Sequence, residues 1–194
     1  MDMGKVLFLN GASSSGKSTL IKELQAKLTD PYLEMGLDKF IWMLPKRYHN
    51  QPLWDDILGK ADTAGALGHQ LVHAMHRAIY ALSHSGLNVL VDHVLVEPNW
   101  MLDCARLFSD VEAYLIGLRC DLEILEKREK ERLDRTLGQA KAQFWKVHAY
   151  KSYDFEVNTG RYSAEESVNQ ILRFLQSNKK PMALKKLLSI KDST

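Results

Sequence analysis

The segment from Gly11 to Ser18, with the sequence GASSSGKS, constrains this chain more than any other feature. It matches the pattern GxxxxGK[S/T], whose chance probability at ordinary residue frequencies is on the order of 1% for a chain of this length. An apolar run from Lys5 to Asn10 precedes it, and apolar residues at helical spacing follow it. These are Leu20, Ile21, Leu24 and Leu28. The segment therefore predicts a strand, a glycine loop and a helix in direct succession.

The residue types in this loop are those that phosphate binding requires. Gly11 and Gly16 allow the backbone to curl so that successive N–H groups face an anion, and the helix N-terminus adds a favourable dipole. Lys17 can then reach the β- and γ-phosphates, and Ser18 can bind Mg²⁺. The alternative is a flexible serine-glycine turn. The predicted nucleotide-binding residues are Gly11, Ala12, Ser13, Ser14, Ser15, Gly16, Lys17, Ser18 and Thr19.

The rest of the chain alternates between short apolar runs and longer segments with helical periodicity. Strands are expected at 32–35, 87–91, 111–118 and 155–157, and helices at 63–85, 97–108, 121–132 and from the capping-box sequence that begins at Ser163. This alternation predicts an α/β fold with a doubly wound, mostly parallel five-stranded sheet and helices on both faces. With 194 residues, we expect one domain over 1–177 and a basic tail over 178–194.

Composition excludes several classes of protein. The net charge of +2 is too small to predict a nucleic-acid or membrane partner, and the apolar run near the N-terminus is too short for a signal or a membrane span. Two cysteines, Cys104 and Cys120, have no metal-binding or disulfide pattern and are compatible with a reducing cytoplasm. We therefore expect a cytoplasmic protein, with the choice between monomer and homo-oligomer open.

Two aspartates follow predicted strands. Asp92 ends the run Val89–Asp92, at the edge where open α/β sheets bind ligands, so it is a candidate to hold Mg²⁺ directly or through water. The alternative for Asp92 is a turn-capping residue. Asp38 follows the second strand and precedes a short helix, so helix capping and a catalytic role are both open for it.

Three arginines late in the chain share one predicted helix face. Arg128, Arg132 and Arg135 are spaced i, i+4 and i+7, and Arg119 ends the preceding strand. Guanidinium groups can stabilise the charge on a transferring phosphoryl group. Because glutamates interleave with these arginines, a solvated, salt-bridged helix face is the alternative.

Two further features favour structural roles. His69, His73 and His76 share a helix face, but no cysteine or carboxylate lies at supporting spacing on that helix, so we expect packing rather than metal binding. The lysine-rich tail 178–194 has the pattern of a weak amphipathic segment, but a frayed terminus is the favoured interpretation.

Several stretches resemble, in order, the chloramphenicol phosphotransferase family of P-loop small-molecule kinases over about residues 4–176. They are LNGASSSGKST, GLDKFIWMLP, VLVDHV, LRCDLEILEKREKERLDR, VH and YDFEVNT. The resemblance implies a P-loop NTPase fold of the nucleotide-kinase type, with a small arginine-rich lid at about 128–142. It also implies Asp38 as the general base, Asp92 in the active site, Arg128 on adenine, and Arg132 and Arg135 on phosphates. The chain differs at His93, where the family has an acidic residue, and over 46–62, which faces the acceptor.

The residues and the resemblance together predict an ATP- and Mg²⁺-dependent phosphotransferase that acts on a hydroxyl of a small molecule, with a chloramphenicol-like acceptor as one option. The expected catalytic residues are Lys17, Asp38, Arg132 and Arg135, and the expected metal ligands are Ser18 and Asp92. A nucleotide, nucleoside or sugar-nucleotide kinase of the zeta-toxin type is the alternative enzyme. A non-enzymatic ATP-binding switch is the alternative from another class.

Overall fold

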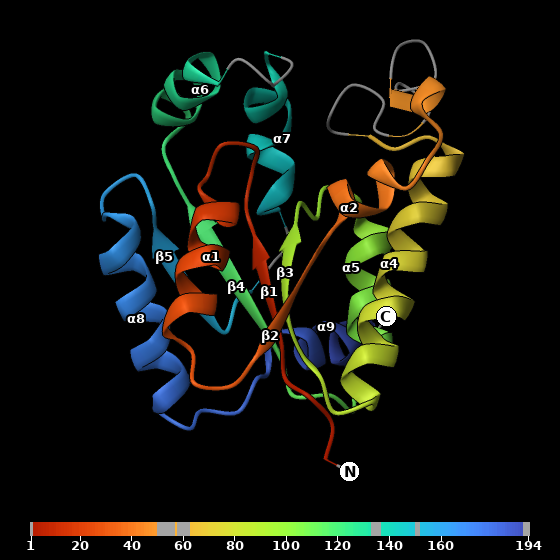
Figure 1. Ribbon diagram of the computed structural model, residues 1–194, viewed down its shortest axis with the longest axis vertical. Coiled ribbons are helices and arrows are strands. Elements are labelled where there is room, and N and C mark those ends of the chain that lie inside the picture. Colours follow the sequence, from red (N-terminus) through yellow and green to blue (C-terminus); the bar gives the residue numbers. More distant parts are fainter. Residues whose placement is uncertain (1, 50–56, 58–62, 133–136, 150–151, 192–194) are drawn as a thin grey trace.

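The computed structural model describes residues 2–49, 57, 63–132, 137–149 and 152–191 (Figure 1). Within these residues, five parallel strands form one sheet in the order β2-β3-β1-β4-β5. The strands are β1 Val6–Asn10, β2 Tyr32–Gly36, β3 Asn88–His93, β4 Ala113–Arg119 and β5 Phe155–Asn158. The predicted doubly wound five-stranded sheet is confirmed, and it is parallel throughout.

The helices between and after the strands agree with the predicted alternation to within a few residues. They are α1 Lys17–Lys27, α2 Leu37–Trp42, the 3-10 helix η1 Lys46–His49, α4 Ala66–His84, α5 Pro98–Leu107, α6 Leu122–Glu131, α7 Gln139–Val147, α8 Ala164–Gln176 and α9 Ala183–Lys191. The capping box at Ser163 and Glu166 is present as predicted. Helix α7 was not predicted as an element. No helix in the described ranges has the length and apolar character needed to cross a lipid bilayer.

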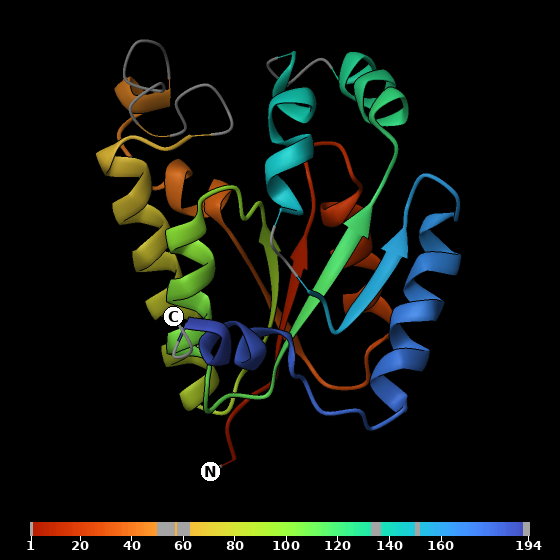
Figure 2. The same ribbon diagram turned by 180° about the vertical axis from the view of Figure 1, so that it is seen from behind.

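Strand β1 shows why helices cover both faces of the sheet. Its residues are buried on both sides: Val6 and Phe8 face one apolar cluster, and Leu7 and Leu9 face the other. Alternate residues of a strand point to opposite faces, so a continuously apolar strand requires two covering layers. Helices α4, α5 and α9 supply one layer, and α1 and α8 supply the other (Figures 1 and 2).

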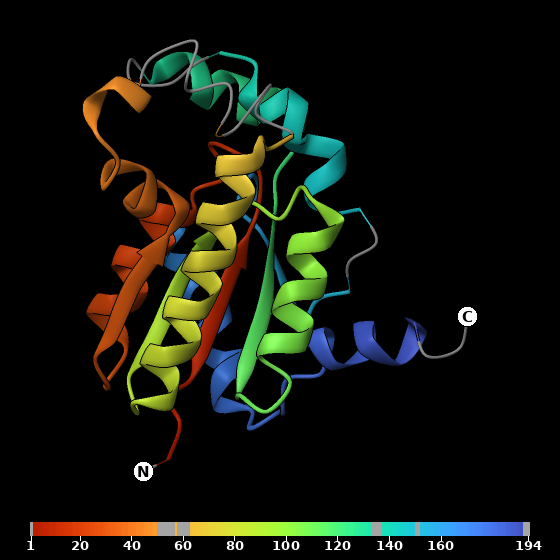
Figure 3. The same ribbon diagram turned by 90° about the vertical axis from the view of Figure 1, so that its right-hand side faces the viewer.

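The carboxyl ends of the strands lie at one edge of the sheet, with α6 and α7 beyond them (Figure 3). Asn10, the last residue of β1, is fully buried and fixes this edge. Its Nδ2 donates to the Val147 carbonyl at 2.8 Å and to the Tyr153 hydroxyl at 2.7 Å, and its Oδ1 accepts from the Leu95 N–H at 2.8 Å. The end of α7 is thereby held against the central strand, next to the glycine loop.

The expectation of a frayed C-terminal tail is wrong for the described part of that tail. Helix α9 packs against α5 and β4, where Ala183 and Leu184 are buried in the same cluster as α4 and α5 (Figure 2). Asp154 Oδ1 accepts hydrogen bonds from the Met182 and Ala183 N–H groups at 2.6 and 2.9 Å, so a side chain distant in sequence satisfies the helix start. The apolar face of this amphipathic segment therefore packs against the protein's own sheet and α5.

Candidate active site

Most of the predicted site residues line one cavity of about 600 Å³ at the carboxyl edge of the sheet. Gly11, Ala12 and Ser15 of the loop are not among its lining residues. The glycine loop, the start of α2, the end of β3, the last turn of α6 and the β5–α8 connection form its walls. The predicted residues that line it are Ser13, Ser14, Gly16, Lys17, Ser18, Thr19, Asp38, Asp92, Arg128 and Arg132. Arg135 and the rest of 133–136 lie outside the described residues. Residues separated by more than a hundred positions thus share one pocket.

The loop has the curled backbone that its glycines predict. Gly16 has a φ of 89°, a left-handed conformation that glycine adopts without steric cost, and it immediately precedes α1. Lys17 is buried, and its Nζ donates hydrogen bonds of 2.9 Å to the carbonyls of both Gly11 and Ala12. The ammonium group is therefore held against the loop backbone, where it can attract an anion bound by the loop.

Unpaired hydroxyl groups in the loop indicate what it binds. The Oγ atoms of Ser13, Ser14 and Ser15 are buried, and none has a hydrogen-bond partner among the described residues. Buried polar groups are normally paired, and an exception calls for a missing ligand or water. A phosphate group offers several acceptor oxygens to such donors. The loop thus fits the phosphates of a nucleotide, and the alternative of a flexible turn does not explain its geometry.

Asp92 contacts the two functional side chains at the start of α1. Its Oδ2 accepts a hydrogen bond of 3.0 Å from Ser18 Oγ, and its Oδ1 lies 3.6 Å from Lys17 Nζ. Asp92 lies within β3, so the turn-capping interpretation is wrong. A hydroxyl and a carboxylate are the hard oxygen ligands that Mg²⁺ prefers, so this pair fits that ion.

Asp38 lies in the first turn of α2, and its side chain lines the cavity. The residue at the N-cap position is Gly36, without a side-chain cap, so the helix-capping interpretation of Asp38 is wrong. Four apolar residues, Leu37, Val94, Val96 and Trp100, also line the cavity. The charged residues Glu34 and Lys39, close to Asp38 in the sequence, line it as well.

The arginines have different positions. Arg128 lines the cavity, and its Nη2 donates to the Thr159 carbonyl at 2.8 Å. Arg132 is the C-cap residue that follows α6, and it also lines the cavity. Its backbone is extended, so the predicted helix face shared by the arginines is wrong at Arg132. Arg119 pairs with Glu156 at 2.6 Å and is not among the lining residues. The alternative interpretation is that the glutamates and arginines of this helix form a solvated, salt-bridged face. It is wrong for Glu129, which is buried and accepts hydrogen bonds from the N–H groups of Gly138 and Ala140 at the start of α7.

Sequence reasoning missed two residues that hold the loop. Gln143 of α7 accepts a hydrogen bond of 2.7 Å from the Ser13 N–H. Thr159 Oγ1 donates to the Ser15 carbonyl at 2.8 Å. Thr159 belongs to the stretch YDFEVNT, which could have drawn attention to it, whereas no local pattern singles out Gln143.

His69, His73 and His76 of α4 contact α5, and the predicted packing between helices is present. His69 Nδ1 accepts a hydrogen bond from Trp100 Nε1 at 3.0 Å, and His76 is fully buried. Helix α4 contains no cysteine or carboxylate, but α5 places Asp103 and Cys104 beside His76. Because these two residues belong to another helix, spacing within α4 does not indicate the contact.

The parallel sheet in this order, with the glycine loop at the end of β1 and the cavity beside it, has the architecture of a P-loop protein. The family profile described as chloramphenicol phosphotransferase-like protein matches residues 4–176, and the chain belongs to this family. A proposed O-phosphotransferase of Mycobacterium tuberculosis strain H37Rv is 29% identical over 201 residues, which cover 96% of this chain and 89% of that protein.

Solved structures of small-molecule kinases share the fold. The APS kinase CysC of Mycobacterium tuberculosis, in complex with AMPPNP and APS, gives a TM-score of 0.66 at 16% identity, covering 91% of this chain and 99% of the other. A gluconokinase of Sinorhizobium meliloti 1021 gives 0.63 at 14% identity, covering 91% and 94%. At such identities the likeness establishes the fold and leaves the acceptor open.

Proposed function

We propose that this protein transfers the γ-phosphoryl group of ATP to a hydroxyl group of a small molecule. The observation that carries the proposal is the single cavity in which a phosphate-binding loop and the carboxylate of Asp38 are both wall residues. Phosphoryl transfer needs a cradle for the donor phosphates and a base near the acceptor hydroxyl, within one enclosed volume.

In this mechanism the loop residues 11–19 bind the phosphates of ATP, and Lys17 stabilises the charge on the transferring group. Ser18 and Asp92 would hold Mg²⁺, which neutralises charge on the β- and γ-phosphates when bound. Arg128 is assigned to the adenine side, and Arg132 and Arg135 to the phosphates. The segment at about 128–142 would act as the lid that excludes water.

Asp38 accepts the proton of the acceptor hydroxyl as its oxygen bonds to the γ-phosphorus. The bond to the β,γ-bridging oxygen breaks, and the products are ADP, a phosphate monoester and the proton. The apolar lining residues Leu37, Val94, Val96 and Trp100 favour an acceptor with an apolar or aromatic body. Family membership favours this enzyme over a non-enzymatic ATP-binding switch.

The test uses γ-labelled ATP, Mg²⁺ and a pool of alcohols that includes chloramphenicol, nucleosides, nucleotides, adenylyl sulfate and sugars. We expect one labelled small molecule, whose identity separates the antibiotic-like acceptor from the nucleotide and sugar alternatives. Asp38→Asn should lower turnover by about 10²- to 10⁴-fold with nucleotide affinity nearly unchanged. Asp30→Asn, at an exposed position outside the cavity, is the matched control.

Two results would contradict the proposal at different points. Equal turnover of Asp38→Asn and Asp30→Asn would remove Asp38 from the role of base. Tight ATP binding with no labelled product from any alcohol in the pool would favour the nucleotide-binding switch.

A further inference from the structure

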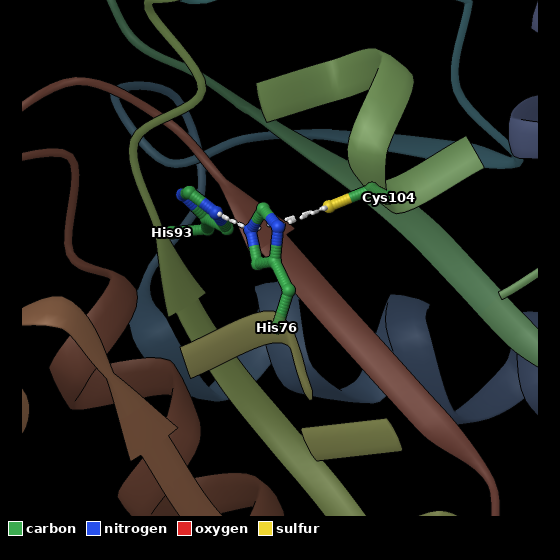
Figure 4. Close-up of side chains that lie close together, drawn as sticks. All are labelled: His76, His93 and Cys104. Carbon is green, nitrogen blue, oxygen red and sulfur yellow. Dashed lines mark hydrogen bonds between the residues drawn. The ribbon is translucent and has the colours of Figure 1, made fainter. Parts of the chain in front are cut away.

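A cluster of three potential metal ligands lies behind the candidate active site, on the face of the sheet that α4 and α5 cover (Figure 4). His76 comes from α4, His93 from the end of β3 and Cys104 from α5. Each is at most 1% exposed. Their ligating atoms all lie within 4.8 Å of one another. Three consecutive elements thus bring nitrogen and sulfur ligands to one buried point.

The central imidazole is oriented for coordination. His76 Nδ1 lies 2.6 Å from Asp103 Oδ2. A carboxylate at this distance accepts a hydrogen bond from the Nδ1–H group, which leaves the lone pair of the ring on Nε2. A carboxylate on the far nitrogen is the usual outer partner of a metal-binding histidine.

The three side chains already contact one another. His76 Nε2 lies 2.8 Å from His93 Nε2 and 3.4 Å from Cys104 Sγ, and the same sulfur lies 3.8 Å from His76 Nδ1 (Figure 4). In a tetrahedral zinc site, the known bond lengths separate two nitrogens by about 3.3 Å and a nitrogen from a sulfur by about 3.6 Å. To reach this arrangement, the two imidazoles must move apart, and the Cys104 side chain must turn from the face of the His76 ring toward Nε2. The metal would replace the short contact between the two rings.

We propose that His76 Nε2, His93 Nε2 and Cys104 Sγ bind a zinc-class divalent ion, with Asp103 as the residue that positions His76. A thiolate and two imidazoles select a borderline-soft ion and disfavour Mg²⁺, which prefers oxygen. Binding replaces the thiol proton of Cys104, which leaves to solvent as the S–metal bond forms, without any redox change.

This site is separate from the one proposed for the nucleotide. Asp92 and His93 are adjacent in β3, so their side chains point to opposite faces, one toward Ser18 and the other toward His76. The ion would link α4, β3 and α5 directly behind Trp100, whose ring centroid lies 6.2 Å from that of His93. The inference does not depend on the proposed phosphotransfer, and its test needs no ATP.

The test is anaerobic titration of the full-length, chelator-treated and reduced protein with Co²⁺, a spectroscopic substitute for Zn²⁺. We expect saturation at one ion per chain, with a thiolate-to-cobalt charge-transfer band and the visible bands of tetrahedral cobalt. Zn²⁺ should displace the cobalt and remove both. Cys104→Ala should abolish the charge-transfer band, whereas Cys120→Ala, at the other buried cysteine, should retain it.

Asp103→Asn tests the positioning role, and we expect its metal affinity to fall roughly 10- to 100-fold while the shape of the spectrum is retained. The wild-type titration decides the proposal even where a variant does not fold. If wild-type protein gives only the spectrum of hydrated Co²⁺, or if Cys104→Ala keeps the charge-transfer band, the proposal is wrong. The three residues are then a hydrogen-bonded packing cluster.

Discussion

Asp92 and His93 are neighbours in one strand, and they belong to two different environments. The Asp92 side chain is 26% exposed at the cavity and contacts Lys17 and Ser18. The His93 side chain is buried among α4 and α5 and contacts His76. A single peptide bond therefore separates a solvent-accessible polar site from a closed polar cluster. The two faces of a strand end can therefore carry independent chemistry, and we expect substitutions on one face to affect catalysis and those on the other to affect stability.

The largest expected effect is on the cavity face. Lys17→Ala removes the ammonium group that lies over the loop. We expect phosphoryl transfer to fall about 10³-fold, because the positive charge that stabilises the transferring phosphoryl group is lost. Single-turnover transfer from labelled ATP measures this. Lys22→Ala, at an exposed position of the same helix, is the control. If Lys17→Ala transferred phosphate at the wild-type rate, the loop lysine would have no role in catalysis.

On the buried face, His76→Ala should lower the free energy of unfolding by about 3 kcal/mol, because it leaves a cavity and removes the partner of Asp103 and His93. Urea unfolding measures the change, and His84→Ala, less buried at the end of the same helix, is the control. At a temperature where the variant is folded, transfer should change by less than about threefold. A loss of transfer as large as that of Lys17→Ala would show that the faces are coupled.

Asp92→Asn changes only the cavity-facing member of the Asp92–His93 pair and tests its role as a metal ligand. We expect turnover to fall about 100-fold and the Mg²⁺ concentration for half-maximal activity to rise, because a neutral amide is a weaker ligand for a hard cation. An activity titration with Mg²⁺ measures both, with Asp30→Asn as the control. An unchanged Mg²⁺ requirement would remove Asp92 from the metal site.

The smallest expected effect concerns how the loop is held. Thr159→Val deletes the hydrogen bond to the Ser15 carbonyl while it preserves the shape of the side chain, at a cost of about 1 kcal/mol. If that cost falls on the nucleotide-binding conformation of the loop, nucleotide affinity should drop about fivefold. Equilibrium titration with a non-hydrolysable ATP analogue measures it against Thr29→Val, at an exposed position. Equal affinities would mean that this hydrogen bond does not contribute to binding.

Much of the candidate site could be predicted because its signals are local. Residues 11–19 are contiguous, and Asp38 and Asp92 follow recognisable strands, so topology alone brings them to one edge. Gln143 could not be found in this way, because its role depends on how α7 is held over the loop by Asn10 and Glu129. The tail was misjudged for a similar reason: its pattern shows an apolar face, but only packing shows that α5 and β4 cover that face.

The sequence by itself determined the phosphate loop, the strand-helix alternation and hence the parallel sheet, because these follow from composition and spacing within short segments. Only the tertiary structure decided which side chains meet across elements. His93 and Cys104 lie 17 and 28 positions after His76, and the three residues have no common motif. Their meeting depends on the rotation of α4 and α5 against the sheet, which is set by the packing of the whole apolar layer rather than by any one segment.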